Sequence, residues 1–299
     1  MARGDGRGGA EAGAGDLRTN AVESAAAVRR TDLSDVFAAN RAAGRIALSV
    51  QAHGGVTRRH QVYEHGPLRV RFPNAYDGAL EAVFVNTAGG IAGGDRHDLE
   101  LAAGEGTALT ATTAAAEKVY RALGPNAEIA VTLSAAAKSK LCWLPQETIL
   151  FDRSRLARRI DVDLDATASL LMAEAVVFGR AAMGERVEEG VFTDRWRVRR
   201  GGRLIFAETV RLDGAIARRL AEPAVAAGGA AIATVLAVPG DEAAVARVRA
   251  QTFCGEVGAS AWNGLAAARL CAKDGASLRR DLGVVIGAFG GVLPRCWLN

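Results

Sequence analysis

The sequence predicts a mostly β protein with two α-helices near its C-terminus. From Gly44 to about residue 212, short stretches that favour β-strands alternate with turn residues. Some of these stretches alternate strictly between apolar and polar residues, which is typical of a half-buried sheet. Others are continuously apolar, which is typical of a strand covered on both faces. Helical spacing of apolar residues begins only after residue 240. These patterns suit a solenoid, a sandwich or a barrel equally well.

The predicted strands follow one another at short intervals. The first seven are residues 45–50, 68–72, 80–85, 97–101, 107–113, 128–133 and 140–144. Longer ones follow at 158–164, where Ile160, Val162 and Leu164 share a face, and at 170–178, which is nearly all apolar. Residues 191–198 and 203–212 are predicted to form a hairpin across Gly201 and Gly202. The last two predicted strands are 230–238 and 265–272.

Two α-helices are predicted late in the chain. Asp241 follows Pro239 and Gly240 and is a suitable N-cap for a helix over residues 242–251. Ser277 is the predicted cap of a second helix over 278–289, where apolar residues recur at helical spacing.

Composition limits the class of protein. With 299 residues, 49% of them hydrophobic, the chain can bury the core of one large or two average domains. Residues 1–41 combine Gly, Ala and mixed charges, so we expect a disordered tail there. The four cysteines form no C-x-x-C pair, which argues against a zinc ribbon or a thioredoxin-type site.

Charge and hydropathy indicate where the protein acts. No signal-peptide core and no apolar run of about 18 residues occurs, so we expect a cytoplasmic protein without a membrane partner. The net charge of +4 comes from 37 Lys and Arg against 33 Asp and Glu, a modest excess for a nucleic-acid binder. We therefore expect no nucleic-acid partner.

Residues 88–96 contain four glycines in six positions, followed by Asp95. A phosphate-binding P-loop requires Lys and then Ser or Thr after its last glycine, whereas Asp95 and Arg96 stand here. A dinucleotide-binding motif requires a helix next, but a predicted strand follows. The segment is therefore predicted to be the turn of a β-hairpin, with Asp95 at its end.

Histidines are few, and all four precede residue 98. No G-x-S-x-G motif accompanies them, which argues against a nucleophilic hydrolase. Asp95 and His97 are two residues apart and can face the same side of a strand, a spacing that can hold a metal ion. A metal-dependent β-rich hydrolase is therefore an alternative function, against the simpler interpretation of a solvated hairpin.

Two glutamates lie in apolar strands. Glu174 interrupts the apolar run 170–178, and a carboxylate covered on both sides must be paired, protonated, hydrated or directed at a metal. A functional role and a buried salt bridge to an arginine are both open for it. Glu208 is a milder case, because a half-exposed strand would place it in water.

Three further residues are candidates for partner binding. Arg195 and Arg197 share one face of strand 191–198, where they could bind an acidic partner, although a solvated strand face is the simpler interpretation. Trp143 precedes a turn and is either an exposed interface anchor or a buried aromatic that braces the turn.

Six segments together carry a resemblance to a known family. They are residues 89–95 (GGIAGGD), 117–121 (EKVYR), 143–152 (WLPQETILFD), 179–185 (GRAAMGE), 196–198 (WRV) and 293–297 (LPRCW). In this order they resemble the urease accessory protein D family, UreD, also called UreH. The resemblance covers residues 43–299 and leaves only the N-terminal tail outside.

The resemblance implies a fold and a function. The fold is a β-helix-like stack of many short strands with two α-helices, in a single domain over residues 42–299 whose part from about 222 onward contains the helices. The function is that of a non-enzymatic urease maturation factor. It binds apo-urease and recruits UreF, which brings the GTPase UreG, and nickel insertion is the outcome. No tightly bound cofactor is expected, only transient Ni²⁺.

The resemblance also implies an internal, water-filled passage along which nickel reaches the urease active site. Four acids are the candidates to line it: Asp95, Glu117, Glu174 and Glu208. Weak oxygen ligands along a passage let an ion enter and leave, whereas a cage of Cys or His would trap it.

Overall fold

The computed structural model describes residues 41–73 and 78–298, which belong to one compact unit beginning at Arg41. Two β-sheets of seven and ten strands make up most of this unit, and three α-helices occur within the described residues. The prediction of a mostly β protein is confirmed. The predicted tail, residues 1–41, lies outside the described residues except for Arg41.

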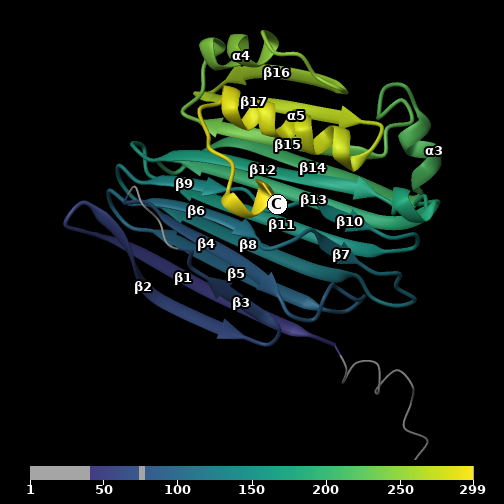
Figure 1. Cartoon of the computed structure of the whole chain (residues 1–299), viewed down its shortest axis with the longest axis horizontal. Helices are drawn as coiled ribbons and strands as arrows, with labels where there is room; N and C mark the ends of the chain where they lie inside the picture. Colours follow the sequence, from purple (N-terminus) through teal and green to yellow (C-terminus); the bar gives the residue numbers. More distant parts are fainter. Residues whose placement is uncertain (1–40, 74–77, 299) are drawn as a thin grey trace, which may run out of the picture. The chain divides into compact units, whose positions relative to one another are not determined.

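The two sheets share the strands as follows (Figure 1). The seven-stranded sheet consists, in spatial order, of β14 (Arg203–Ala215), β13 (Glu189–Arg200), β11 (Arg155–Leu164), β8 (Ala127–Ala135), β5 (Arg96–Ala103), β1 (Ala43–His53) and β2 (Val56–His65). The main path of the ten-stranded sheet is β16 (Glu256–Trp262), β17 (Leu265–Ala272), β15 (Ala231–Val238), β12 (Ser169–Phe178), β9 (Lys140–Trp143), β6 (Ala108–Thr113), β4 (Leu80–Asn86) and β3 (Leu68–Arg71). The short β10 (Thr148–Leu150) joins β12 to β7 (Glu117–Val119).

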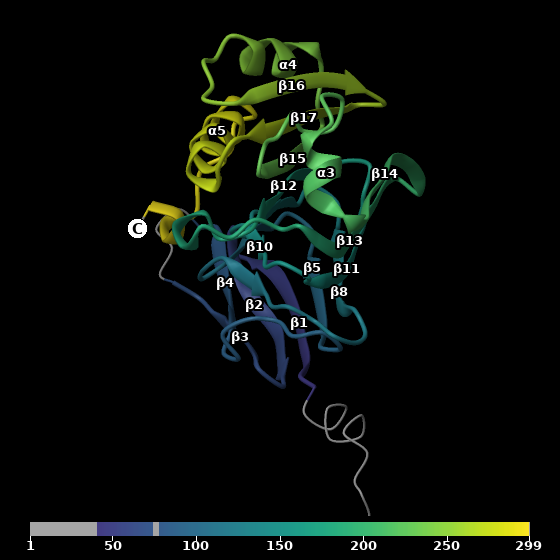
Figure 2. The ribbon, with the colours of Figure 1, turned by 90° about the vertical axis from the view of Figure 1, so that its right-hand side faces the viewer.

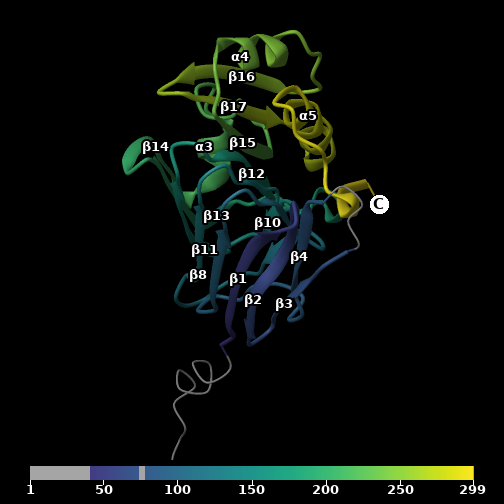
Figure 3. The same ribbon diagram turned by 90° about the vertical axis from the view of Figure 1, so that its left-hand side faces the viewer.

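The chain winds as a β-helix-like coil. From β4 to β13 the long strands fall alternately in the ten-stranded and the seven-stranded sheet. Within each sheet, the strands of successive coils pair in parallel. In the seven-stranded sheet β5 pairs with β8 and β8 with β11. In the ten-stranded sheet β4 pairs with β6 and β6 with β9. Figures 2 and 3 show the two sheets facing each other. This confirms the β-helix-like stack among the architectures that the strand pattern left open.

The predicted hairpin around the glycine segment is wrong. β4 and β5 flank it, but they belong to different sheets, so the segment is a crossover from one sheet to the other. The alternating pattern of β5 is real, yet its partners are β1 and β8, both parallel. Position 90 requires glycine, because a Cβ atom there would lie 2.5 Å from the Tyr120 ring. Tyr120 donates a hydrogen bond to the carbonyl of Gly89 at 2.7 Å and so holds the crossover.

The predicted hairpin of β13 and β14 is confirmed. The two strands pair antiparallel across Gly201 and Gly202. On β13, Phe192, Asp194 and Trp196 are buried, whereas Arg195 is exposed.

The C-terminal part extends the ten-stranded sheet with antiparallel strands. β15, β17 and β16 continue from β12, and the helices α4 (Glu242–Arg249) and α5 (Gly275–Ala288) pack against them. The Asp241 cap is confirmed, since its carboxylate accepts a hydrogen bond from the Ala244 amide at 2.9 Å. Ser277 is not the second cap. Asp274 caps α5 and accepts from the Ser277 amide at 2.7 Å, so this helix starts three residues earlier than predicted.

Several elements were not predicted. The strand β2 is mostly exposed and polar, so its sequence carries no apolar alternation. The strands β7, β10 and β16 are short or weakly patterned, and the helix α3 (Ile216–Ala221) has only six residues. The described residues contain no helix long and apolar enough to cross a membrane.

The main core fills the space between the two sheets. Alternate residues of the parallel strands point into it, as the regular burial pattern of β8 illustrates. Ile46, Leu133, Leu141 and Ile160 are fully buried there. Polar side chains interrupt this apolar interior in one region, which forms the candidate site.

Candidate functional site: polar cavities between the two sheets

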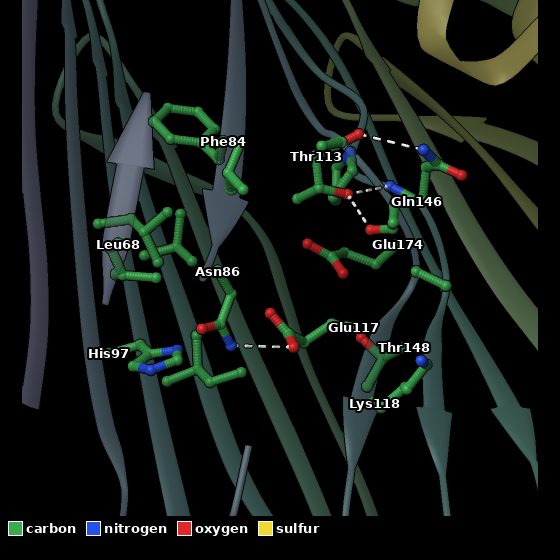
Figure 4. Close-up of a pocket in the computed structure, with 18 of the residues that line it drawn as sticks. Leu68, Phe84, Asn86, His97, Thr113, Glu117, Lys118, Gln146, Thr148 and Glu174 are labelled. Carbon is green, nitrogen blue, oxygen red and sulfur yellow. Dashed lines mark hydrogen bonds between the residues drawn. The ribbon is translucent and has the colours of Figure 1, made fainter. Parts of the chain in front are cut away.

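A cavity of about 230 Å³ lies between the facing sheets (Figure 4). Apolar side chains such as Phe84, Leu99 and Val131 form part of its wall. Polar and ionisable side chains from both sheets also line it: Asn86, His97, Glu117, Thr148, Arg158 and Glu174.

The polar residues of the seven-stranded sheet lie in one row across its strands. His97 on β5 is in register with Ile129 on β8, which is in register with Arg158 on β11, which faces Asp194 on β13. Because neighbouring strands are about 4.8 Å apart, His97 and Asp194 are separated by roughly 14 Å along this row. The parallel coils therefore place residues distant in sequence side by side on one inner face.

Arg158 sits between two buried carboxylates. Its Nε and Nη2 atoms donate to the two oxygens of Asp194 at 3.1 and 2.6 Å. Its Nη1 atom donates to Glu174 from the opposite sheet and to the hydroxyl of Thr148. Burial lowers the pKa of the guanidinium, but the Asp194 and Glu174 carboxylates more than offset this and raise it above its usual value. With both carboxylates ionised, this triad carries one excess negative charge.

Glu174 is fully enclosed in this arrangement. Its second oxygen accepts a hydrogen bond from the indole nitrogen of Trp143 at 2.7 Å. Burial raises the pKa of the Glu174 carboxyl to about 7, although Arg158 acts in the opposite direction. Of the two roles left open for Glu174, the buried salt bridge to an arginine is confirmed. The carboxylate also lines the cavity, so a functional role stays a prediction.

A second, smaller cavity of about 30 Å³ adjoins the first. Both cavities are lined by Arg158 and Glu174, so these two side chains separate them. Asp194 and Glu208 line the smaller one. Glu208 is half-buried on β14 and accepts hydrogen bonds from the exposed guanidinium of Arg269, at 3.0 and 2.5 Å. Glu208 therefore faces the interior, not the solvent that its strand pattern suggested.

Glu117 lies on the wall of the larger cavity, on the short strand β7. Its carboxylate accepts a hydrogen bond from the amide of Asn86 at 3.1 Å (Figure 4). Burial raises the pKa of this carboxyl to about 7, although the Asn86 hydrogen bond acts in the opposite direction.

The raised pKa of Glu117 predicts a stability that depends on pH. Between about pH 4.5 and 7 the folded protein holds a proton on Glu117 that the unfolded chain has lost, so the free energy of unfolding falls as pH rises. Glu117→Gln removes this penalty and is expected to stabilise the protein by about 1 to 3 kcal/mol at pH 8 and by little at pH 4.5. Urea unfolding at the two pH values measures the difference. An equal effect of Glu117→Gln at both values would contradict the buried carboxyl.

Asp95 does not line either cavity. It is buried in the crossover, where one oxygen accepts from the Ala42 amide and the other from the Ala92 amide, both at 2.8 Å. Its carboxylate is therefore committed to the backbone. His97, two residues later, does line the larger cavity, so the pair that the sequence suggested as metal ligands is divided between two environments.

The candidates for partner binding fare differently. Trp143 is only 3% exposed, so it is not a surface anchor; it braces Glu174 and packs against the Phe84 ring at 6.0 Å between centroids. Arg195 is exposed on the outer face of β13. Arg197 is half-buried, donates to the carbonyls of Trp196 and Glu208, and stands opposite Asp161 on β11.

Sequence reasoning missed Arg158 and did not use Asp194 or His97 as cavity residues. The signal was present. Arg158 has the same parity as Ile160 on β11, and Asp194 the same parity as Phe192 on β13, so both sit at inward positions of alternating strands. A charged residue at an inward position indicates either a buried ion pair or a polar cavity.

Within residues 41–73 and 78–298, no group of three or more His, Cys, Asp and Glu side chains is placed to hold a metal ion. The acids of the site are instead spread along two adjoining cavities. Fold and site together define a β-helix-like protein with two adjoining cavities between its sheets, into which buried polar and ionisable side chains project.

Comparison with known proteins identifies the family. The family of UreD urease accessory proteins matches residues 42–297. The chain is 62% identical over 269 residues to urease accessory protein UreD 3 of Bradyrhizobium sp. strain BTAi1, covering 89% of this chain and 97% of that protein. It is 62% identical over 272 residues to UreD of Rhodopseudomonas palustris strain BisB18, covering 90% and 98%. It is 60% identical over 268 residues to UreD of Bradyrhizobium diazoefficiens, covering 89% and 97%. The chain belongs to the UreD family of urease accessory proteins.

Proposed function

We propose that this protein is a cytoplasmic urease maturation factor. It binds apo-urease and acts with UreF and the GTPase UreG to promote nickel insertion, without catalysing a reaction itself. Membership of the UreD family and the names of relatives about 60% identical support the link to urease.

We further propose that Ni²⁺ travels through the interior between the two sheets. The observation that carries this proposal is the position of Glu117, Glu174 and Glu208. Glu117 and Glu174 line the larger cavity, and Glu174 and Glu208 line the smaller one, so the three acids follow one another along adjoining spaces. Asp95 is not among the acids of the proposed passage, because both of its carboxylate oxygens accept hydrogen bonds from backbone amides.

The chemistry of the lining suits a cargo ion that does not stay. Single carboxylates bind divalent ions weakly and exchange them readily, unlike a closed cage of Cys and His. The Arg158 triad stands at the narrow point, where the smaller cavity of about 30 Å³ has room for only about one or two water molecules. A hydrated Ni²⁺ therefore has to shed water there, or the Arg158 side chain has to move.

Co-expression with apo-urease, UreF and UreG tests the passage. Glu174→Gln and Glu208→Gln are expected to leave the accessory complex assembled and to lower the nickel content per urease active site several-fold, because each removes a negative charge from a cavity wall. Metal analysis of purified urease measures the effect, and size-exclusion chromatography checks the assembly.

Glu128→Gln is the matched control, since Glu128 is an exposed acid on the outer side of β8, paired with Arg96. It should leave the nickel content unchanged. If both cavity variants load urease as fully as the control, the passage is refuted. If the wild-type chain fails to co-purify with apo-urease at moderate salt, the maturation role itself is refuted.

A further inference from the structure

The imidazole of His97 has a feature that the carboxylates of the site lack. Its side chain is only 3% exposed, and its Nε2 atom has no hydrogen-bond partner among the described residues. A buried polar atom without a partner costs free energy, so its persistence calls for an explanation such as a ligand. His97 lines the larger cavity, which offers space for one.

The imidazole is suited to binding a metal. Burial lowers the pKa of His97 below its usual value, although the carboxylates of Asp95 and Asp98 act in the opposite direction. A neutral imidazole has a free lone pair, which is the form that coordinates metal ions.

A carboxylate lines the same cavity from the other sheet. Glu117 on β7 shares the cavity wall with His97 on β5, and Figure 4 shows both side chains on the same cavity with Asn86 near them. The Asn86 amide donates to Glu117 and its oxygen accepts from the Ala88 amide, so Asn86 orients the carboxylate without itself being free to bind.

We propose that His97 Nε2 and the Glu117 carboxylate form a transient binding site for a divalent transition-metal ion, which gives the larger cavity its preference for Ni²⁺ over Mg²⁺ and Ca²⁺. This inference rests on the proposed passage and adds its selectivity. Magnesium and calcium prefer oxygen ligands, whereas imidazole favours nickel, copper and zinc. Two protein ligands leave the remaining coordination positions to water, for which a cavity of about 230 Å³ has room. An ion held this way is selected and then released.

The test uses Ni²⁺ itself with the full-length chain. His53, His60 and His65 are exposed on β1 and β2 and could bind nickel adventitiously, so all three are replaced by Gln in the background protein. X-ray absorption at the nickel edge is expected to show one imidazole ligand in this background. Isothermal titration should show that excess Mg²⁺ displaces little of the bound Ni²⁺.

Two variants separate the ligands. His97→Leu, of similar volume, is expected to abolish the imidazole signature and to weaken Ni²⁺ binding about tenfold or more, a loss of at least about 1.4 kcal/mol. Glu117→Gln should weaken binding but keep the imidazole signature at saturating nickel. Circular dichroism verifies that both variants are folded.

The outcomes distinguish this site from the passage. Nickel bound by the background protein without an imidazole ligand, or binding unchanged in folded His97→Leu, would overturn the site. If either of these results is found while Glu174→Gln lowers the nickel content of urease, the His97 site is overturned and the passage is still supported. An imidazole signature lost in His97→Leu supports the site even if urease loading proves independent of Glu174 and Glu208.

Discussion

Arg158→Met is expected to destabilise the protein by about 3 to 5 kcal/mol, the usual cost of removing one partner from a buried ion pair. Arg158 donates to Glu174 and to both oxygens of Asp194, and all three side chains are almost completely buried. Without the guanidinium, two carboxylates from facing sheets would share an apolar interior without a counter-ion. At least one of them would have to take up a proton.

Urea unfolding of the variant at pH 8 and at pH 5 measures this effect. The loss should be larger at pH 8, because the orphaned carboxylates are then further from protonation. Adding Glu174→Gln and Asp194→Asn to Arg158→Met should restore part of the stability, since the uncompensated charge is gone. Arg269→Met is the control: Arg269 is exposed, and its pair with Glu208 should contribute no more than about 1 kcal/mol. A loss from Arg158→Met no larger than that of the control would contradict the buried triad.

Asp95→Ala is expected to cost about 2 to 4 kcal/mol of stability. The carboxylate accepts two backbone hydrogen bonds that tie Ala42, at the entrance to β1, to Ala92 in the crossover. Alanine would leave both amides without this acceptor, and hydrogen bonds to a charged group are among the stronger ones. Asp95→Asn keeps one carbonyl oxygen and should cost about half as much.

Thermal unfolding of the two Asp95 variants measures this order. Because Asp95 lines neither cavity, the Asp95→Ala protein that remains folded should still support normal urease nickel content. If Asp95→Ala had wild-type stability but lowered the nickel content of urease, Asp95 would have to be counted among the residues of the passage.

Many of the strands could be predicted from the sequence because successive coils repeat the same pattern of burial. On strands such as β8 and β11 one face lies against the core, so alternation of apolar and polar residues marks them in the sequence. Which strands pair with one another cannot be recognised from this alternation. The hairpin predicted around Asp95 failed for this reason: the glycines permit a turn, but whether the next strand returns to the same sheet depends on pairing with β1 and β8, which are distant in the chain.

The site was predictable in part. Glu174 stands out because an acid in a continuous apolar run needs an explanation, and the structure places it on both cavities. Its partner Arg158 was not identified, since contact between β11 and β12 across the interior is set by how the two sheets face each other. Trp143 shows the same limit: its position before a turn is compatible with exposure, whereas the indole in fact donates to Glu174 inside the protein.

The coiled arrangement also means that the length of the polar row across the seven-stranded sheet changes in fixed steps. Each coil adds one strand to each sheet, so one additional coil moves the far end of the polar row outward by about 4.8 Å. In this protein the row from His97 to Asp194 spans three such steps. A coil inserted between β8 and β11 would lengthen the distance from His97 to Arg158 by one step while leaving the Arg158 triad intact. In the proposed passage, the separation between His97 and the narrow point at Arg158 would thus be set by the number of coils between them.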